Sequence, residues 1–196
     1  DSASSAPERG SSVAAPERVP LLEARQLTVR FGGLVAVDRV DARFHAGELV
    51  GIIGPNGAGK TTFFNAISGV QTPTSGRLEL AGRDLTGRKP HQFARLGLAR
   101  TFQTPRVFAD LPVAANIEFG LKFAGRRPRK WWLWGEERGV SWALRDAQSI
   151  LSLIGLTAQA GLRAADVTPA QQRLLEIGMA LATRPRMLLL EEVAAG

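Results

Sequence analysis

A glycine-rich run in the first third of the chain has the composition and spacing of a phosphate-binding loop. Residues 54–61 read GPNGAGKT and match G-x-x-x-x-G-K-[ST] at every fixed position. Gly57 and Gly59 let the backbone turn and approach oxygen atoms that a Cβ would push away. Lys60 is then expected to reach the β- and γ-phosphates of a nucleoside triphosphate, and the Thr61 hydroxyl to ligate Mg²⁺. The residues predicted to contact phosphate are Gly54, Pro55, Asn56, Gly57, Ala58, Gly59, Lys60, Thr61 and Thr62. The alternative is a glycine-rich turn with an incidental lysine.

A pair of carboxylates near the end of the chain offers the second half of such a site. Glu191 and Glu192 directly follow the apolar run Met187–Leu190. Phosphoryl transfer to water needs one carboxylate that holds Mg²⁺ and another that orients the attacking water. The sequence therefore predicts Glu191 on the metal and Glu192 on the water. Two acidic residues that merely end a strand are the simpler interpretation.

Two apolar runs indicate buried strands that position these groups. Leu49–Ile53 enters the phosphate loop and Met187–Leu190 precedes the carboxylates. Continuous apolar runs of this kind are typical of strands covered on both faces in a central parallel sheet. By contrast, Leu27, Val29 and Phe31 alternate with polar residues, and so does the segment 77–80. Alternation predicts half-exposed antiparallel strands.

Helical periodicity fills the intervals between these strands. A helix is expected from Lys60 to about Ser68, ended by Gly69, and another near Ala170–Thr183, ended before Pro185. On that last helix the predicted common face consists of Leu174, Ile177, Gly178 and Leu181. A further helix, capped by Ser141 and ended by Gly155, is predicted from the shared face of Ala143, Ala147, Ile150, Leu151 and Ile154. The order of elements predicts an α/β nucleotide-binding core with an antiparallel β part before it and a helical insertion within it.

Composition narrows the class of protein. The chain has 196 residues, of which 44% are hydrophobic and 22% charged, and no apolar run approaches the roughly 18 residues needed to cross a bilayer. It has no cysteine, so disulfides and thiolate metal sites are excluded. Residues 1–20 are rich in Ser, Ala and Pro and lack the pattern of a secretory signal. They are interpreted as a disordered tail on a cytoplasmic domain.

The formal net charge of +7 fits a nucleotide, a nucleic acid or an anionic membrane surface equally well. Four cationic residues lie within Arg126–Lys130, and Trp131, Trp132 and Trp134 follow at once. This cluster could face lipid headgroups or an acidic partner. The simpler alternative is a solvated basic loop whose tryptophans pack inward.

Several segments taken in order resemble the nucleotide-binding domain of an ABC transporter. They are RFGGLVAV at 30–37, the phosphate loop, RTFQ at 100–103, RVF at 106–108, QQRLLEI at 171–177, LLLEE at 188–192 and AAG at 194–196. The combination is most similar to the subgroup that energises branched-chain amino-acid importers, and it covers about residues 21–196. The resemblance implies a P-loop NTPase (RecA-like) core. It also implies a β subdomain and P-loop core at 21–103, a helical subdomain at 104–178, and the second carboxylate strand at 179–196.

The same resemblance implies further site residues. Phe31 would stack on adenine, with Gly32 allowing a close turn beside it. Gln103 would lie at the hinge to the helical subdomain, where it would sense the metal and the γ-phosphate. It is therefore expected to be a catalytic residue together with Glu192 and also a metal ligand. Phe31 as a core aromatic and Gln103 as a surface glutamine are the simpler alternatives.

The resemblance also implies cofactors and partners. ATP and Mg²⁺ would bind, and the helical segment after Gln103 would dock onto membrane-spanning permease subunits at the cytoplasmic face of the membrane. A second ATP-binding subunit, identical or different, would complete the sites, and a periplasmic or extracellular substrate-binding protein would take part indirectly. Nucleic acid is not expected as a partner.

Three departures from the family pattern bear on turnover. The signature segment, Leu-Ser-x-Gly-Gln in the family, reads VTPAQ at 167–171, so Ala170 adds a Cβ where a partner's γ-phosphate approaches. Glu191 stands where the family has Asp, and Val193 where it has Pro. The chain ends at Gly196, before the family's switch histidine and its remaining core strands. The sequence therefore leaves open a truncated or degenerate ATP-binding module without turnover, and a soluble P-loop ATPase that acts on nucleic acid.

Overall fold

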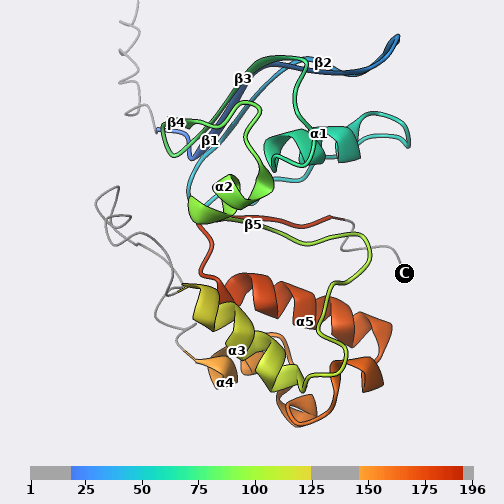
Figure 1. The fold of residues 1–196 in the computed structure, drawn as a ribbon, viewed down its shortest axis with the longest axis vertical. Helices are drawn as coiled ribbons and strands as arrows, with labels where there is room; N and C mark the ends of the chain where they lie inside the picture. Colours follow the sequence, from blue (N-terminus) through green and yellow to red (C-terminus); the bar gives the residue numbers. More distant parts are fainter. Residues whose placement is uncertain (1–18, 125–145, 192–196) are drawn as a thin grey trace, which may run out of the picture.

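A computed structural model describes residues 19–124 and 146–191 of the chain. The predictions for the tail at 1–18, for the basic and tryptophan-rich cluster, for the Ser141 cap and for Glu192 therefore lie outside the described residues. Among the described residues, Figure 1 shows an antiparallel sheet with two helices against it in one half of the molecule, and a group of three helices in the other half.

The first sheet is antiparallel and is formed mainly by the N-terminal part of the chain. Its strands are β1 (Leu22–Phe31), β2 (Leu34–Phe44), β3 (Ser75–Leu80) and β4 (Arg83–Asp84), in the order β2-β1-β3-β4 (Figure 1). β1 lies in the middle, so Leu22 is opposite Phe44 on one side and Leu80 on the other. The antiparallel strands predicted from alternation are confirmed.

Two helices cover one face of this sheet. They are α1 (Lys60–Ile67) and α2 (Pro90–Arg95), and both lie between the sheet and the rest of the molecule (Figure 1). The fully buried apolar side chains of this half come from both the sheet and the helices, and they include Leu22, Leu27, Val29, Ile67, Leu78, Leu80 and Phe93. The α1 helix that the sequence predicts is confirmed.

A second, parallel sheet joins β5 (Leu98–Arg100) and β6 (Met187–Leu189). It confirms a parallel strand within the predicted run Met187–Leu190, although only Leu189 is buried and Met187 and Leu188 are half-buried. The strand predicted for Leu49–Ile53 is wrong in this structure: the segment has no strand geometry, and Leu49 and Ile53 are 100% and 96% exposed. A strand needs a hydrogen-bonded neighbour to be stable, and no described strand pairs with residues 49–53.

The helical half packs around a separate apolar cluster. Its helices are α3 (Val113–Ala124), α4 (Ala147–Leu153) and α5 (Pro169–Ala182), with short 3₁₀ turns at Thr157–Gln159 and Ala164–Asp166. Ile117, Ile150 and Leu175 are fully buried in this cluster. α3 and α5 approach so closely that a Cβ on Gly120 would lie 2.7 Å from the Cβ of Ala182. Small residues therefore set the contact between these helices.

Two details of the predicted helices need correction. α4 begins at Ala147, and Asp146 caps it: the Asp146 Oδ1 accepts from the Ser149 N–H at 2.8 Å, a cap that the sequence pattern did not select, while the predicted position Ala143 lies outside the described residues. On α5 the buried positions include Leu175, while Leu174 is 42% exposed. The face that α3 and α4 cover keeps Gly178 from the predicted set, but Leu175 and Ala182 are its buried apolar side chains where periodicity selects Leu174 and Leu181.

Candidate nucleotide-binding site

The loop at residues 54–59 leads directly into the N-terminus of α1. Gly59 is the N-cap residue in a left-handed conformation with φ of 80°. A Cβ at this position would lie 2.1 Å from the carbonyl oxygen of Ala36 on β2, so only glycine fits. No side chain caps α1 and its first turn contains no acidic residue. The first N–H groups and the positive end of the helix dipole are therefore available to an anion.

The side chain of Lys60 folds back over this loop. Its Nζ donates to the carbonyl oxygens of Gly54 at 2.6 Å and Pro55 at 2.7 Å. These two carbonyls hold the ammonium group above the glycine-rich backbone. Phosphate oxygens could replace these two carbonyl oxygens as acceptors. The new hydrogen bonds would join two charged groups and would be stronger than those to a neutral carbonyl.

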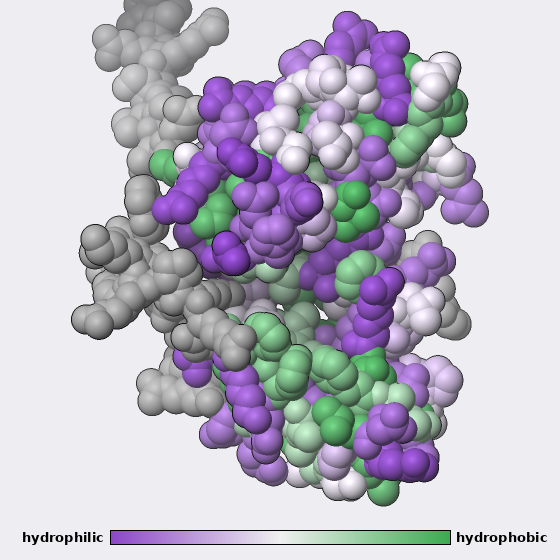
Figure 2. All heavy atoms as spheres, viewed as in Figure 1, coloured by the Kyte–Doolittle hydropathy of each residue, from purple (hydrophilic) through white to green (hydrophobic). Residues whose placement is uncertain are grey.

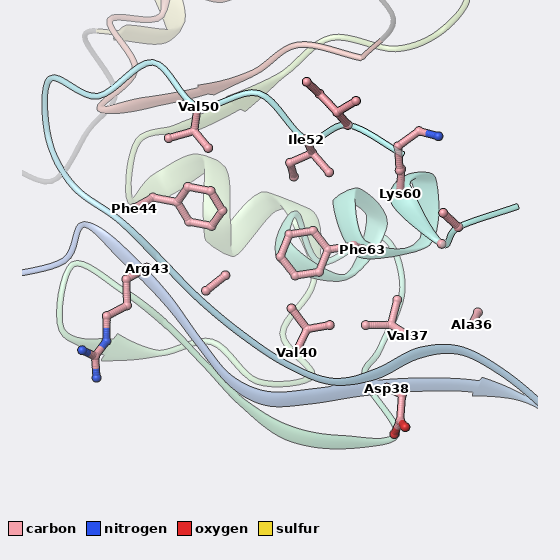
Figure 3. A pocket seen from close by; sticks show the side chains of 14 residues that line it. Ala36, Val37, Asp38, Val40, Arg43, Phe44, Val50, Ile52, Lys60 and Phe63 are labelled. Carbon is pink, nitrogen blue, oxygen red and sulfur yellow. The ribbon is translucent and has the colours of Figure 1, made fainter. Parts of the chain in front are cut away.

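An apolar cavity of about 480 Å³ lies between β2, the Val50–Ile53 segment and the start of α1. Its lining is dominated by aliphatic and aromatic side chains. Figure 3 shows Val40, Phe44, Ile52 and Phe63 directed toward it, while Asp38 and Arg43 point away. The interior of this cavity therefore suits apolar groups, and the phosphate-binding surface is the exposed loop at its edge.

Phe31 ends β1 and is 49% exposed. Its neighbours on the strand, Leu27 and Val29, are fully buried. The alternative that Phe31 is a core aromatic is therefore wrong. Its exposed ring is accessible to a stacking base, and the adenine role stays a prediction.

The structure brings Gln103 and Glu191 together through one arginine on α5. Arg173 donates to the Gln103 carbonyl oxygen at 3.2 Å and to the Glu191 carbonyl oxygen at 2.5 Å. These residues follow β5 and β6, which are parallel neighbours, so the two chain segments leave the same edge of the sheet. Two residues predicted from distant parts of the sequence thus lie at one junction.

The carboxylate of Glu191 is engaged with Arg100. The Arg100 Nη2 lies 2.7 Å from the Glu191 Oε2, and its Nη1 donates to the Ser68 Oγ at 2.8 Å. Ser68 is the C-cap residue of α1, whereas Thr61 lies in the first turn, roughly 10 Å away along the helix axis. Arg100 therefore directs Glu191 toward the end of α1 opposite to Thr61.

The residues present fit a nucleotide better than they fit a complete metal site. Mg²⁺ prefers oxygen ligands and commonly binds one or two protein groups together with substrate phosphates. The exposed Thr61 hydroxyl meets that requirement, and the Gln103 amide has the right chemistry. Glu191 can contribute only after it leaves Arg100. No group of three or more His, Cys, Asp or Glu side chains within residues 19–124 and 146–191 could hold a metal ion.

The signature-like segment at 167–171 forms the start of α5. The Thr168 Oγ1 accepts from the Gln171 N–H at 3.3 Å, and the Gln171 Oε1 accepts from the Thr168 N–H at 2.9 Å. Pro169 has no N–H to donate. The capping box therefore uses the first-turn N–H of Gln171 and one acceptor lone pair of the Thr168 oxygen, and the Thr168 hydroxyl proton takes no part in it.

No role was assigned from the sequence to Arg100, Arg173 or Glu176. Their side chains connect α5, β5 and the segments that follow β5 and β6, and we call this contact region the α5 junction. Glu176 is only 6% exposed and accepts from the backbone N–H of Phe102 at 3.1 Å and of Arg106 at 3.3 Å. The available signal was an arginine and a glutamate three residues apart beside apolar helix positions. That spacing does not identify contacts more than 60 residues away.

A glycine-rich loop at the head of α1, with Gln103 and Glu191 following adjacent parallel strands, defines a P-loop nucleotide-binding protein. The family model described as ABC transporter matches residues 37–195. The chain is 40% identical over 184 residues to the branched-chain amino acid transport ATP-binding protein LivG of Escherichia coli strain K12. It is 39% identical over 183 residues to BraF of Pseudomonas aeruginosa, also a high-affinity branched-chain amino acid transport ATP-binding protein. Both alignments cover 90% of this chain and 71% of the relative.

Solved structures agree with the sequence relatives. An ATP-binding cassette of an ABC transporter in its ADP conformation superposes with a TM-score of 0.73 at 30% identity, covering 91% of this chain and 70% of that one. A nucleotide-free ATP-binding cassette gives a TM-score of 0.71 at 30% identity, with 91% and 71% covered. The chain belongs to the ABC transporter family of ATP-binding proteins. No helix among the described residues is long and apolar enough to cross a membrane.

Proposed function

We propose that this chain is the ATP-binding subunit of an ABC importer, and that it couples ATP binding and hydrolysis to the uptake of branched-chain or similar amino acids. The observation that carries the proposal is the Gly54–Thr62 loop at the exposed head of α1, in a chain 40% identical to LivG. The amino-acid class comes from the relatives.

Nucleotide recognition follows from the loop. An incoming triphosphate displaces the Gly54 and Pro55 carbonyls from Lys60, and its oxygens accept from the N–H groups at the start of α1. Thr61 would hold Mg²⁺ beside the phosphates, where the ion supplies neutralisation of the developing negative charge. Phe31 would carry the base on its exposed ring. Glu192 would orient the attacking water. Gln103 would face the γ-phosphate end, and Glu191 would join it after leaving Arg100.

A partly exposed aromatic patch suits docking to a membrane-spanning permease subunit. The patch consists of Phe108, Leu111, Phe119 and Phe123, each between 39% and 49% exposed. The Phe119 ring centroid lies 4.6 Å from that of Phe108 and 5.1 Å from that of Phe123. Figure 2 shows apolar residues gathered over the helical half, in contrast to the more polar sheet half. Contiguous apolar surface of this kind often marks an interaction site.

The proposal places the chain peripherally at the cytoplasmic face of the membrane. The aromatic patch would contact the cytoplasmic loops of the permease subunits. A second ATP-binding subunit would supply the opposite half of each site, and the substrate-binding protein would act on the outer side. These partners follow from the family rather than from contacts in this chain.

A second candidate function is nucleotide binding without turnover. It is favoured by the Arg100–Glu191 ion pair. This contact occupies the carboxylate that the family resemblance assigns to the metal. Steady-state release of phosphate from ATP by the assembled protein would exclude this candidate.

Co-purification with the permease subunits of a branched-chain amino-acid importer tests the proposal. The wild-type chain should co-purify, and Phe119→Asp should lose most of the bound permease because a charge is introduced into the aromatic patch. Val70→Asp is the matched control: Val70 is 51% exposed, but it follows α1 in the sheet half. Failure of the wild-type chain to bind the permease, while Mg·ATP binding is intact, would contradict the importer assignment.

A further inference from the structure

Two side chains one turn apart on α5 hold the segment at residues 102–106 by its backbone. Glu176 accepts from the N–H groups of Phe102 and Arg106 at 3.1 and 3.3 Å. Arg173 donates to the carbonyl oxygens of Phe102 and Gln103, the latter at 3.2 Å, and to the Glu176 Oε2 at 3.3 Å. The segment is therefore fixed by backbone contacts that do not depend on its own side chains.

Burial makes a purely stabilising role a poor explanation of this pair. The side chains of Arg173 and Glu176 are only 16% and 7% exposed. Removing two charges from water is costly, and well-packed apolar residues commonly stabilise a protein equally well at such positions. What an apolar pair could not do is bond the backbone N–H and C=O groups of a neighbouring segment. The charged pair therefore specifies where that segment lies.

Arg173 also holds the segment that follows β6. Its Nη2 donates to the Glu191 carbonyl oxygen at 2.5 Å, while Arg100 binds the Glu191 carboxylate. α5 thus holds both segments that carry the residues expected at the γ-phosphate end of the site. α5 itself begins at Pro169, directly after Thr168 of the signature-like segment. A shift of α5 therefore moves Gln103 and Glu191 together.

We propose that Arg173 and Glu176 are positioning residues that set the placement of Gln103 and Glu191, and thereby the preference of the site for ATP over ADP. This inference rests on the proposed nucleotide-binding function. In the proposed function the loop at Gly54–Thr62 binds the phosphates that both nucleotides share. The segments that α5 holds carry Gln103 and Glu191, which are expected at the γ-phosphate that only ATP has. Loss of the contacts that Arg173 and Glu176 make with residues 102–106 is therefore expected to lower the affinity for Mg·ATP more than the affinity for Mg·ADP.

Equilibrium binding of Mg·ATP and Mg·ADP to the full chain tests this preference. Arg173→Met should weaken Mg·ATP binding by about tenfold, since charge-assisted contacts are lost, and change Mg·ADP binding by less than about twofold. Arg173→Lys should recover only part of the loss, because an ammonium group cannot reproduce the guanidinium fork. Arg163→Met is the matched control: Arg163 also pairs with a carboxylate three residues on, Asp166, but the pair is exposed. It should leave both affinities unchanged.

Amide hydrogen exchange tests the placement itself without nucleotide. Peptides that cover residues 102–106 should exchange at least about tenfold faster in Arg173→Met and more modestly faster in Glu176→Gln, which keeps an acceptor oxygen. Equal weakening of ATP and ADP binding, or unchanged exchange at 102–106 in a folded variant, would overturn the inference. Absence of nucleotide binding by the wild-type chain would instead overturn the proposed function, and the inference with it.

Discussion

Two regions are proposed to contact or position the nucleotide, and they are built in opposite ways. One is the phosphate loop at Gly54–Thr62, and the other is the α5 junction, where Arg173 and Glu176 hold the segments that follow β5 and β6. The loop is exposed, and its conformation depends on glycines and on the head of one helix. The junction is largely buried, and it depends on charged side chains that bond backbone groups about 70 residues distant. The comparison teaches that the conformation of the loop is set locally, whereas the placement of Gln103 and Glu191 depends on contacts between distant parts of the chain.

The largest expected effect concerns the support of the junction. Leu175→Ala should lower the free energy of unfolding by about 2–5 kcal/mol, because Leu175 is fully buried in the helical cluster. The adjacent Leu174→Ala should cost less than about 1 kcal/mol, since this side chain is 42% exposed. Chemical denaturation of both variants provides the measurement. Equal losses would show that α5 buries the face predicted by periodicity after all.

A smaller effect is expected from the backbone of the loop. Gly59→Ala should cost about 1–3 kcal/mol, because it combines a positive φ with a Cβ that would meet the Ala36 carbonyl oxygen at 2.1 Å. Gly57→Ala has a similar φ of 82°, but its Cβ would meet nothing within 4 Å. The Gly57 variant should therefore lose less stability in thermal unfolding. The reverse order would contradict the packing of the loop against β2.

The smallest effect is a pH dependence in the sheet that supports α1. Ion pairs with Arg25 and Arg43 lower the pKa of Glu23 from 4.5 to about 2. Because the folded-state pKa is depressed, the stabilisation is fully present above pH 4.5 and is lost as the pH falls toward 2. Unfolding curves between these pH values should show a smaller decline in Glu23→Gln than in the wild-type chain. Parallel declines would indicate that other carboxylates account for the acid sensitivity.

Much of this architecture can be predicted from the sequence because it is recorded in local patterns. The phosphate loop is a contiguous motif and alternation marks β1 and β3. Gly69 marks the end of α1, and Pro185 follows the end of α5. The 49–53 segment shows where local reasoning fails. Its apolar run predicts a buried strand, but a strand also needs a neighbour, and the described sheets supply none.

The candidate site divides in the same way. Lys60 and Thr61 follow from the motif alone, whereas the engagement of Glu191 by Arg100 does not, because the two residues are 91 positions apart. The hydrogen bonds from the backbone to Glu176 cannot be predicted from the sequence either, because every residue except proline carries a backbone N–H group. The roles of Phe31, Gln103 and Glu191 at a bound nucleotide stay predictions.

Equilibrium binding of Mg·ATP to the wild-type chain, to Lys60→Ala and to Lys122→Ala tests the central claim most directly. Lys60→Ala should weaken binding by about 10- to 100-fold, because bonds from an ammonium group to phosphate are lost, while the unfolding midpoint stays unchanged. Lys122, an exposed lysine in the last turn of α3, is the control and should bind ATP like the wild-type chain when changed to alanine. Binding that is insensitive to Lys60→Ala would contradict the placement of the nucleotide at the Gly54–Thr62 loop.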